Sequence, residues 1–128
     1  VDLITAKALL KPEALRRLDG QDYHFCPGLD CEVVYFACSS GSHFPKTDLL
    51  VTVGQKESED PIPICYCFDI TIADLREDLT RRGETRIPET IAEEIRAGHC
   101  ACEVKNPEGT CCLGKVREAV KRIRSGHQ

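Results

Sequence analysis

Apolar residues recur at spacings of three and four in the second half of the chain, a pattern typical of helices that bury one face. One helix is predicted to begin near Thr71, which has the spacing of a capping box with Asp74. A second is predicted to run from Pro88, a residue favoured in first turns, to Gly98. A third begins at Leu113. The apolar positions of these helices are Ile72, Leu75 and Leu79, then Ile91 and Ile95, then Leu113, Val116, Val120 and Ile123.

The first half of the chain has a different pattern. Residues 1–20 predict two short helices, with Pro12 in the first turn of the second and Gly20 at its end. Residues 32–38 are rich in Val, Tyr and Phe and predict a strand, and residues 49–53 predict a second strand to pair with it. Residues 54–63 carry Pro61 and Pro63 and are predicted to be a linker. The pattern therefore predicts an α+β chain, with a β-containing half at residues 1–60 and a helical half at residues 61–128.

Composition and charge exclude several classes of protein. The chain has 128 residues, of which 41% are hydrophobic and 5% aromatic, so its core is thin and favours support from cross-links or metals. No apolar run approaches the ~20 residues that a membrane helix needs, and without a basic-then-apolar segment we do not expect secretion. A net charge of -4 argues against a nucleic-acid partner. The basic segment 113–128 is more typical of a solvated helix face than of a docking surface.

Nine cysteines are the strongest chemical signal in the chain. A disulfide framework is one interpretation, but the count is odd, and close neighbours such as Cys111 and Cys112 form strained rings. In an intracellular chain the same pattern more often binds metal. Metal ligation is therefore the main prediction, and Cys38 is the residue most easily left as a free thiol. The cysteines are Cys26, Cys31, Cys38, Cys65, Cys67, Cys100, Cys102, Cys111 and Cys112.

The positions of the cysteines relative to the predicted helices indicate an iron–sulfur centre. Cys65 and Cys67 precede the helix that begins near Thr71, and the cysteines of residues 100–112 precede the last helix. Two helix N-termini would then face one set of thiolates. A [2Fe–2S] cluster on four thiolates is negatively charged, and backbone N–H groups and positive helix ends stabilise it. In an extended Cys-x-Cys segment both side chains point to the same face, so one pair suits one iron.

The cysteine segments carry a resemblance to known families. The Cys-x-Cys of residues 65–67, the 32 residues before Cys100 and the cysteines before the last helix resemble the bacterioferritin-associated-ferredoxin type of [2Fe–2S] domain over residues 65–125. Segments 63–68 and 100–114, which read PICYCF and CACEVKNPEGTCCLG, resemble the N-terminal domain of archaeal CopZ-type copper chaperones. Residues 26–36, with Cys26 and Cys31, resemble the zinc-binding half of the same family. This resemblance implies a zinc-stabilised half at residues 1–60 packed on a [2Fe–2S] half at residues 61–128.

The resemblance also implies a division of the thiols between two metals. For the [2Fe–2S] cluster we expect Cys65, Cys67, Cys100 and Cys112, with Cys100 preferred to Cys102 because of the 32-residue gap. For Zn²⁺, which takes four tetrahedral ligands often supplied in pairs, we expect Cys26 and Cys31 together with Cys102 and Cys111. The alternative completes the zinc site locally with Cys38 and His43. His99, beside Cys100, is expected to donate a hydrogen bond to a cluster sulfur and raise the reduction potential.

The function implied by the resemblance is that of a metal-binding redox domain of a copper chaperone. Its cluster would transfer one electron and reduce Cu(II) to Cu(I), a cupric-reductase-like activity. Cu⁺ would then pass to a C-terminal copper-binding domain of the same longer chain and on to a copper-transporting P-type ATPase, with a cytoplasmic location. Two alternatives stay open: a [2Fe–2S] electron-transfer module for another oxidoreductase, and a structural zinc adaptor with no redox role.

Overall fold

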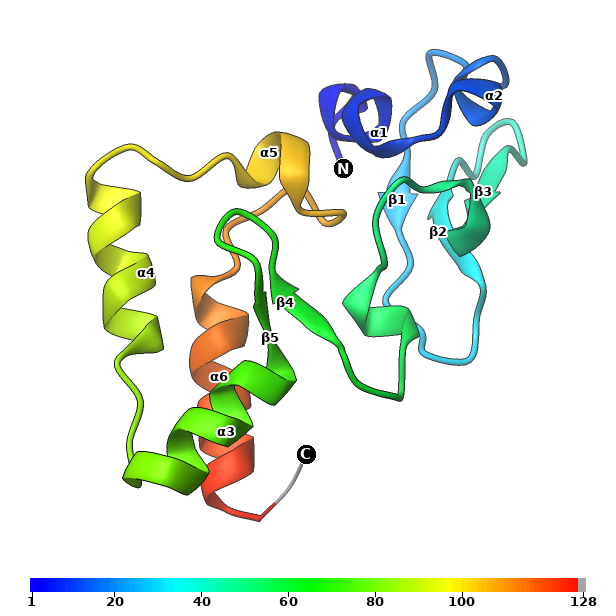
Figure 1. Ribbon diagram of the computed structural model, residues 1–128. Helices are drawn as coiled ribbons and strands as arrows, with labels where there is room; N and C mark the ends of the chain where they lie inside the picture. The colour runs from blue at the N-terminus through cyan, green and yellow to red at the C-terminus, as the bar shows by residue number, and fades with distance from the viewer. Residues whose placement is uncertain (127–128) are drawn as a thin grey trace.

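Helices and two small antiparallel sheets build the α+β fold of residues 1–126, the part of the chain that the computed structural model describes (Figure 1). The expected α+β class is confirmed. The first part of the chain contains α1 (Leu3–Leu9), α2 (Pro12–Leu15), β1 (His24–Phe25), β2 (Val33–Phe36), β3 (His43–Pro45) and the short 3₁₀ helices η1 (Lys46–Asp48) and η2 (Gly54–Lys56). The second part contains β4 (Pro63–Cys65), β5 (Ile70–Thr71), α3 (Ile72–Arg82), α4 (Ile87–Arg96), α5 (Cys102–Lys105) and α6 (Leu113–Arg124).

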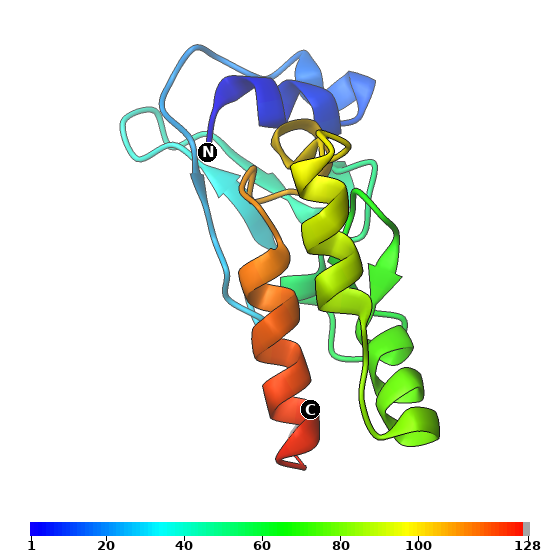
Figure 2. The ribbon, with the colours of Figure 1, turned by 90° about the vertical axis from the view of Figure 1, so that its left-hand side faces the viewer.

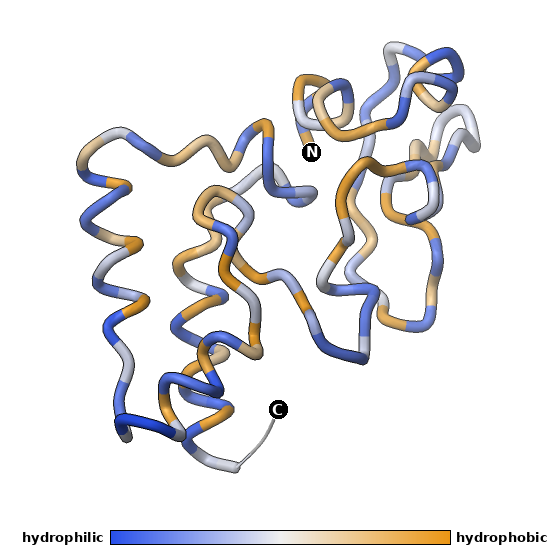
Figure 3. The backbone as a smooth tube through the Cα atoms, in the orientation of Figure 1, coloured by the Kyte–Doolittle hydropathy of each residue, from blue (hydrophilic) through white to orange (hydrophobic). Residues whose placement is uncertain are grey.

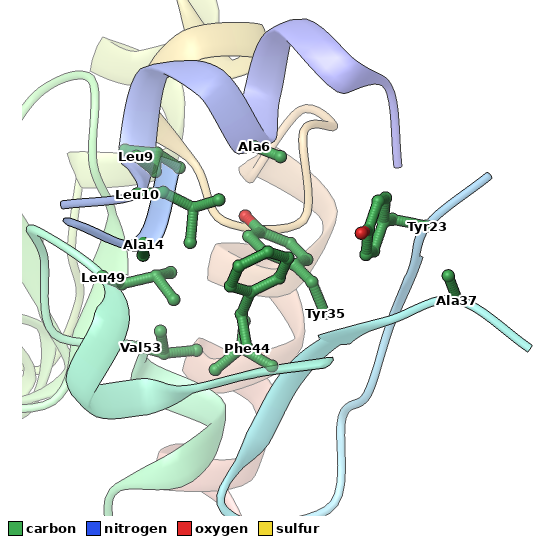
Figure 4. Close-up of a cluster of buried hydrophobic side chains, with 11 residues drawn as sticks. Ala6, Leu9, Leu10, Ala14, Tyr23, Tyr35, Ala37, Phe44, Leu49 and Val53 are labelled. Atoms are coloured by element: carbon green, nitrogen blue, oxygen red, sulfur yellow. The ribbon is translucent and has the colours of Figure 1, made fainter. Parts of the chain in front are cut away.

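The first hydrophobic core is centred on Tyr35 of β2 and Phe44 of β3, which are 0% and 1% exposed. In the three-stranded sheet, β2 lies between β1 and β3. Figure 4 shows the side chains of α1 and of residues 49–53 converging on these two rings. Apolar residues from a helix, a sheet and a loop thus share one core.

Residues 49–53 do not form the second strand that was predicted from their apolar pattern. The strand that pairs with β2 is β3, because the chain reverses within residues 37–42, where Gly41 adopts a φ of 73° and the N–H of Ala37 donates to the carbonyl of Ser42. Leu49 instead forms an isolated bridge with Leu10. The prediction that Gly20 ends the second helix is also wrong, since α2 ends at Leu15.

The second hydrophobic core lies between α3, α4 and α6, as the sequence pattern predicted. α6 packs against both of the other helices, and Figure 2 shows α4 beside it. Thr71 and Asp74 form the expected capping box of α3, and Pro88 lies in the first turn of α4. The hairpin of β4 and β5 and the short helix α5 were not predicted, because two or three strand residues or a single helical turn give no clear periodicity.

Contacts between the two cores join the two parts of the chain. α1 packs on α5, and the Thr5 hydroxyl donates a 2.6 Å hydrogen bond to the carbonyl oxygen of Glu103. Gly109, with a φ of 75°, lies so close to Thr5 that a Cβ there would be 2.8 Å from the Thr5 hydroxyl oxygen. The segment of chain that links the two parts, by contrast, is a hydrophilic loop at residues 57–60 (Figure 3). No helix among residues 1–126 is long and apolar enough to span a membrane.

Candidate metal centres

Four thiols meet between the β4–β5 hairpin and the start of α6. Cys65 ends β4, Cys67 lies in the turn that follows, Cys102 is the first residue of α5, and Cys112 directly precedes α6. The sulfurs of Cys67 and Cys102 are 3.3 Å apart. The thiols of Cys65 and Cys102 both raise the pKa of the Cys112 thiol, so the side chains of the four cysteines lie close to one another. Cys65 and Cys112 are each 1% exposed and Cys102 is 8% exposed.

The thiol contacts and the burial separate the pKa values of these cysteines. A hydrogen bond from the Cys112 thiol stabilises the Cys65 thiolate and lowers the pKa of Cys65 to about 7. The same hydrogen bond raises the pKa of Cys112, and burial raises it further. Burial is the main cause that raises the pKa of Cys102 to about 11. A bound metal ion would therefore displace the protons of the Cys102 and Cys112 thiols, because the thiolate is the form that binds metal.

Backbone N–H groups point at the same sulfurs. The N–H of Ala101 donates to the sulfur of Cys67 across 3.1 Å. The N–H groups of Phe68 and Cys67 donate to Cys65 and contribute to its lowered pKa. Cys112 is the N-cap residue of the 12-residue α6, whose positive end no side chain caps. Such donors stabilise the negative charge of metal-bound thiolates, so the donor set fits an iron–sulfur cluster.

The structure brings together three of the four residues that we expected to hold the [2Fe–2S] cluster, namely Cys65, Cys67 and Cys112. The fourth sulfur in contact with them is that of Cys102, which we had placed with the zinc, and not that of Cys100. Cys102 begins a helical turn, and this turn directs its side chain towards Cys67. The sequence indicates only where this turn must end, because Pro107 disfavours a longer helix.

Cys26 and Cys31 form a second, separate pair of thiols at the end of β1. The N–H of Cys26 donates to the carbonyl of Val34 on β2, and the N–H of Cys31 donates to the carbonyl of Gly28. The two thiols hydrogen-bond to each other. The N–H of Gly28 is the largest cause that lowers the pKa of Cys26, and the Cys31 thiol and the Lys56 ammonium lower it further. This turn therefore offers two sulfur ligands from one face.

The structure does not bring the expected further zinc ligands to this pair. Cys26 lies opposite Val34, whereas His43 pairs with Phe36, about 7 Å further along the strand, and Cys38 lies in the turn beyond, about 13 Å away at the usual rise per residue. Cys102 belongs to the four-thiol group, and Cys111 is exposed. Within residues 1–126, no three His, Cys, Asp or Glu side chains are arranged to hold a single metal ion.

His99 does not contact the thiols. Its Nδ1 atom is 2.5 Å from a carboxylate oxygen of Glu94, and its side chain is 63% exposed. The backbone N–H of Ala101, and not the His99 side chain, donates a hydrogen bond to the sulfur of Cys67. Sequence inspection had no means to find this donor, because every residue except proline carries a backbone N–H.

Comparison with known proteins gives three findings. A family model described as a zinc binding domain matches residues 1–50. The copper chaperone CopZ of Archaeoglobus fulgidus is 34% identical over 131 residues, and the alignment covers 94% of this chain but 61% of that protein. The X-ray structure of the N-terminal domain of Archaeoglobus fulgidus CopZ superposes with a TM-score of 0.70 at 34% identity, covering 98% of this chain and 88% of that one.

Proposed function

The chain belongs to the family of CopZ N-terminal domains, and on that basis we propose that it is the metal-binding redox domain of a copper chaperone. The observation that carries the redox part is the 3.3 Å contact between the sulfurs of Cys67 and Cys102. This contact joins the Cys-x-Cys turn to the segment before α6 and completes a group of four thiols. Four cysteine thiolates are the usual ligand set of a [2Fe–2S] cluster.

The residues that would hold the cluster are Cys65, Cys67, Cys102 and Cys112. From the sequence we expected Cys100 as the fourth ligand. We now propose Cys102 in its place, because the Cys102 sulfur contacts Cys67 and acts on Cys112. When bound, a [2Fe–2S] cluster gives up or takes one electron, the number that separates Cu(II) from Cu(I). The burial of Cys65, Cys102 and Cys112 excludes water from the sulfurs, and the Ala101 N–H and the start of α6 supply compensating positive charge.

A zinc ion in residues 1–60 is the second part of the proposal. Cys26 and Cys31 would supply two of its ligands, and the match of residues 1–50 to a zinc binding domain supports this assignment. We assign this zinc ion a structural role, which requires that further protein ligands complete its coordination and leave no open position. We accordingly divide the chain into a zinc-binding subdomain, residues 1–60, and a [2Fe–2S] subdomain, residues 61–128.

The chain spans 61% of the length of the copper chaperone it resembles, so the proposed partners lie outside it. We propose a C-terminal copper-binding domain of the same longer chain as the immediate acceptor of Cu(I), a copper-transporting P-type ATPase as the destination, and the cytoplasm as the location. Cu(II) is the proposed substrate. Soft thiolate ligands on an acceptor select Cu(I), which makes reduction a useful step before transfer.

The test begins with the protein purified under anaerobic conditions and analysed for iron, sulfide and zinc. We expect two irons and one zinc per chain and visible absorption from the cluster. After reduction with dithionite and removal of excess reductant, addition of Cu(II) should restore the oxidised spectrum while a Cu(I)-specific chelator reports an equal amount of Cu(I). A colourless, iron-free protein would favour a zinc adaptor. A reduced cluster that Cu(II) leaves unchanged would favour electron transfer to another oxidoreductase.

A further inference from the structure

A single helical turn, α5, carries the thiol of Cys102. The carbonyl oxygen of Ala101 accepts hydrogen bonds from the N–H groups of Val104 and Lys105, and no side chain caps the turn. One isolated turn is unstable, because its few hydrogen bonds do not offset the entropy lost when its backbone is fixed. The position of the Cys102 sulfur, 3.3 Å from that of Cys67, therefore depends on contacts from elsewhere in the chain.

Thr5 of α1 supplies a contact directly beside this thiol. α1 packs on α5 (Figure 1), and Thr5 is 1% exposed. Its hydroxyl donates a 2.6 Å hydrogen bond to the carbonyl oxygen of Glu103, the residue that follows Cys102 and lies 98 positions after Thr5. The Tyr35 hydroxyl also reaches this segment, but at Pro107, further from the thiol. Thr5 thus holds the turn at the residue next to its cysteine.

The same side chain meets the other end of this loop. Gly109 packs so closely on Thr5 that a Cβ atom there would be 3.5 Å from the Thr5 methyl carbon and closer still to its hydroxyl oxygen. The Asn106 side chain closes the loop from within by donating a 2.9 Å hydrogen bond to the carbonyl oxygen of Thr110. Thr5 therefore contacts both ends of a closed loop, which restricts how far the turn of α5 can move.

A competing thiol, that of Cys100, lies two residues before Cys102. In an extended segment the two side chains would point to the same face, so both could reach Cys67. The N–H of Ala101 donates to the Cys67 sulfur across 3.1 Å, which keeps the backbone between the two cysteines beside that sulfur. What distinguishes the two thiols is the helical turn that begins at Cys102.

We propose that Thr5 is a positioning residue that selects Cys102 over Cys100 as the fourth cluster ligand, by holding α5 in its helical turn. The inference rests on the proposed function, because the selection acts on the ligands of the proposed cluster. It makes a residue of the zinc-binding subdomain decide a ligand of the [2Fe–2S] subdomain. Without the Thr5 hydroxyl the turn loosens, the segment also adopts extended conformations, and the two thiols compete for the place beside Cys67.

The experiment measures iron per chain in anaerobically purified variants. Cys100→Ser and Cys102→Ser are each made in the parent chain and in two variants that lack the hydroxyl, Thr5→Ala and Thr5→Val. In the parent chain we expect the two cysteine variants to differ in iron content by more than about tenfold. In both Thr5 variants this ratio should shrink by about fivefold, the equilibrium effect of one typical hydrogen bond. Thr5→Ser keeps the donor and should preserve the ratio.

Tyr23→Phe is the matched control. The Tyr23 hydroxyl donates a hydrogen bond of the same length, 2.6 Å, and belongs to a residue of the same core, but its acceptor is Asp19 and not the loop before α6. This substitution should leave the ratio between the cysteine variants at the parent value. A merely structural role of Thr5 would lower the iron content of both cysteine variants together and leave their ratio unchanged, and that outcome would overturn the inference.

Failure of the parent chain to bind iron would count against the proposed function instead. The inference is then decided in the same purified chain by the rate at which iodoacetamide alkylates Cys102, which is 8% exposed. Loss of the Thr5 hydroxyl should raise this rate by about fivefold through local opening of α5. The rate at Cys65 should stay constant, and Tyr23→Phe should change neither rate. An unchanged rate at Cys102 would overturn the inference.

Discussion

The hydroxyl of Tyr35 donates a 2.6 Å hydrogen bond to the carbonyl oxygen of Pro107, 72 residues further along the chain. Tyr35 is 0% exposed and belongs to the first hydrophobic core, and burial strongly raises the pKa of its hydroxyl. Pro107 lies between Cys102 and Cys112, two of the grouped thiols. A single buried contact therefore connects the β-containing core to the segment that carries half of the proposed cluster ligands.

Replacing Tyr35 with Phe should destabilise the protein by about 1–3 kcal/mol, because the carbonyl of Pro107 would stay buried without its donor. Urea denaturation followed by circular dichroism measures the change. Ser39→Ala is the control, since the Ser39 hydroxyl contacts only the exposed Gln21 side chain, and its effect should stay within about 0.5 kcal/mol. Equal effects of the two substitutions would contradict the importance of the Tyr35 contact.

Cys102→Ser should abolish most of the cluster absorption and lower the iron content by more than about tenfold, because it removes the sulfur that contacts Cys67. Cys100→Ser should leave both quantities nearly unchanged, although Cys100 is only two residues away. Iron analysis and visible spectroscopy of anaerobically purified variants decide between the two assignments. The opposite result would restore the ligand set that the 32-residue gap suggested.

Cys31→Ser should lower the zinc content of the purified protein, whereas Cys38→Ser should retain it. The reason is that Cys31 hydrogen-bonds to Cys26, while Cys38 lies at the other end of the hairpin. Elemental analysis after dialysis against a weak chelator measures the difference, which should exceed about tenfold in affinity. Zinc loss in Cys38→Ser would support the local site that includes His43.

Gly54→Ala should destabilise the protein by about 3 kcal/mol, because the new Cβ would clash with the carbonyl oxygen of Pro63. That atom belongs to the backbone of β4 and cannot rotate away. Gly114→Ala is the matched control: Gly114 is exposed in α6 with no atom near the new Cβ, and the substitution should stabilise the helix by about 0.5–1 kcal/mol. Thermal unfolding of both variants should show shifts of opposite sign.

Thr71→Ala should cost about 1 kcal/mol, because the Thr71 hydroxyl accepts a hydrogen bond from the N–H of Asp74 and begins α3. Thr80→Ala, on the exposed surface of the same helix, should instead be neutral or slightly stabilising, since alanine has the higher helix propensity. The comparison by urea denaturation separates the capping contribution from a general effect of removing a threonine. A loss at Thr80 as large as that at Thr71 would contradict the capping role.

The sequence alone determined the main helices of the second core. The capping box of Thr71 and Asp74, the first-turn Pro88 and the apolar spacing of α6 act within a few residues, so their consequences can be read locally. The likeness of the cysteine segments to CopZ-type domains was also present in the sequence, and the comparisons confirm membership of that family. The interactions that form the capping box and the helix turns involve neighbouring residues, so they do not depend on the rest of the fold.

Only the tertiary structure decided which thiols meet and which strands pair. Cys100 and Cys102 are equivalent in a linear pattern. Which of their thiols meets Cys67, 35 residues before Cys102, depends on the single turn of α5. The pairing of β2 with residues 43–45 rather than 49–53 depends on the turn around Gly41 and on the space that Leu49 fills against Leu10. These outcomes arise from contacts between distant segments competing for the same buried volume, and no local sequence signal encodes that competition.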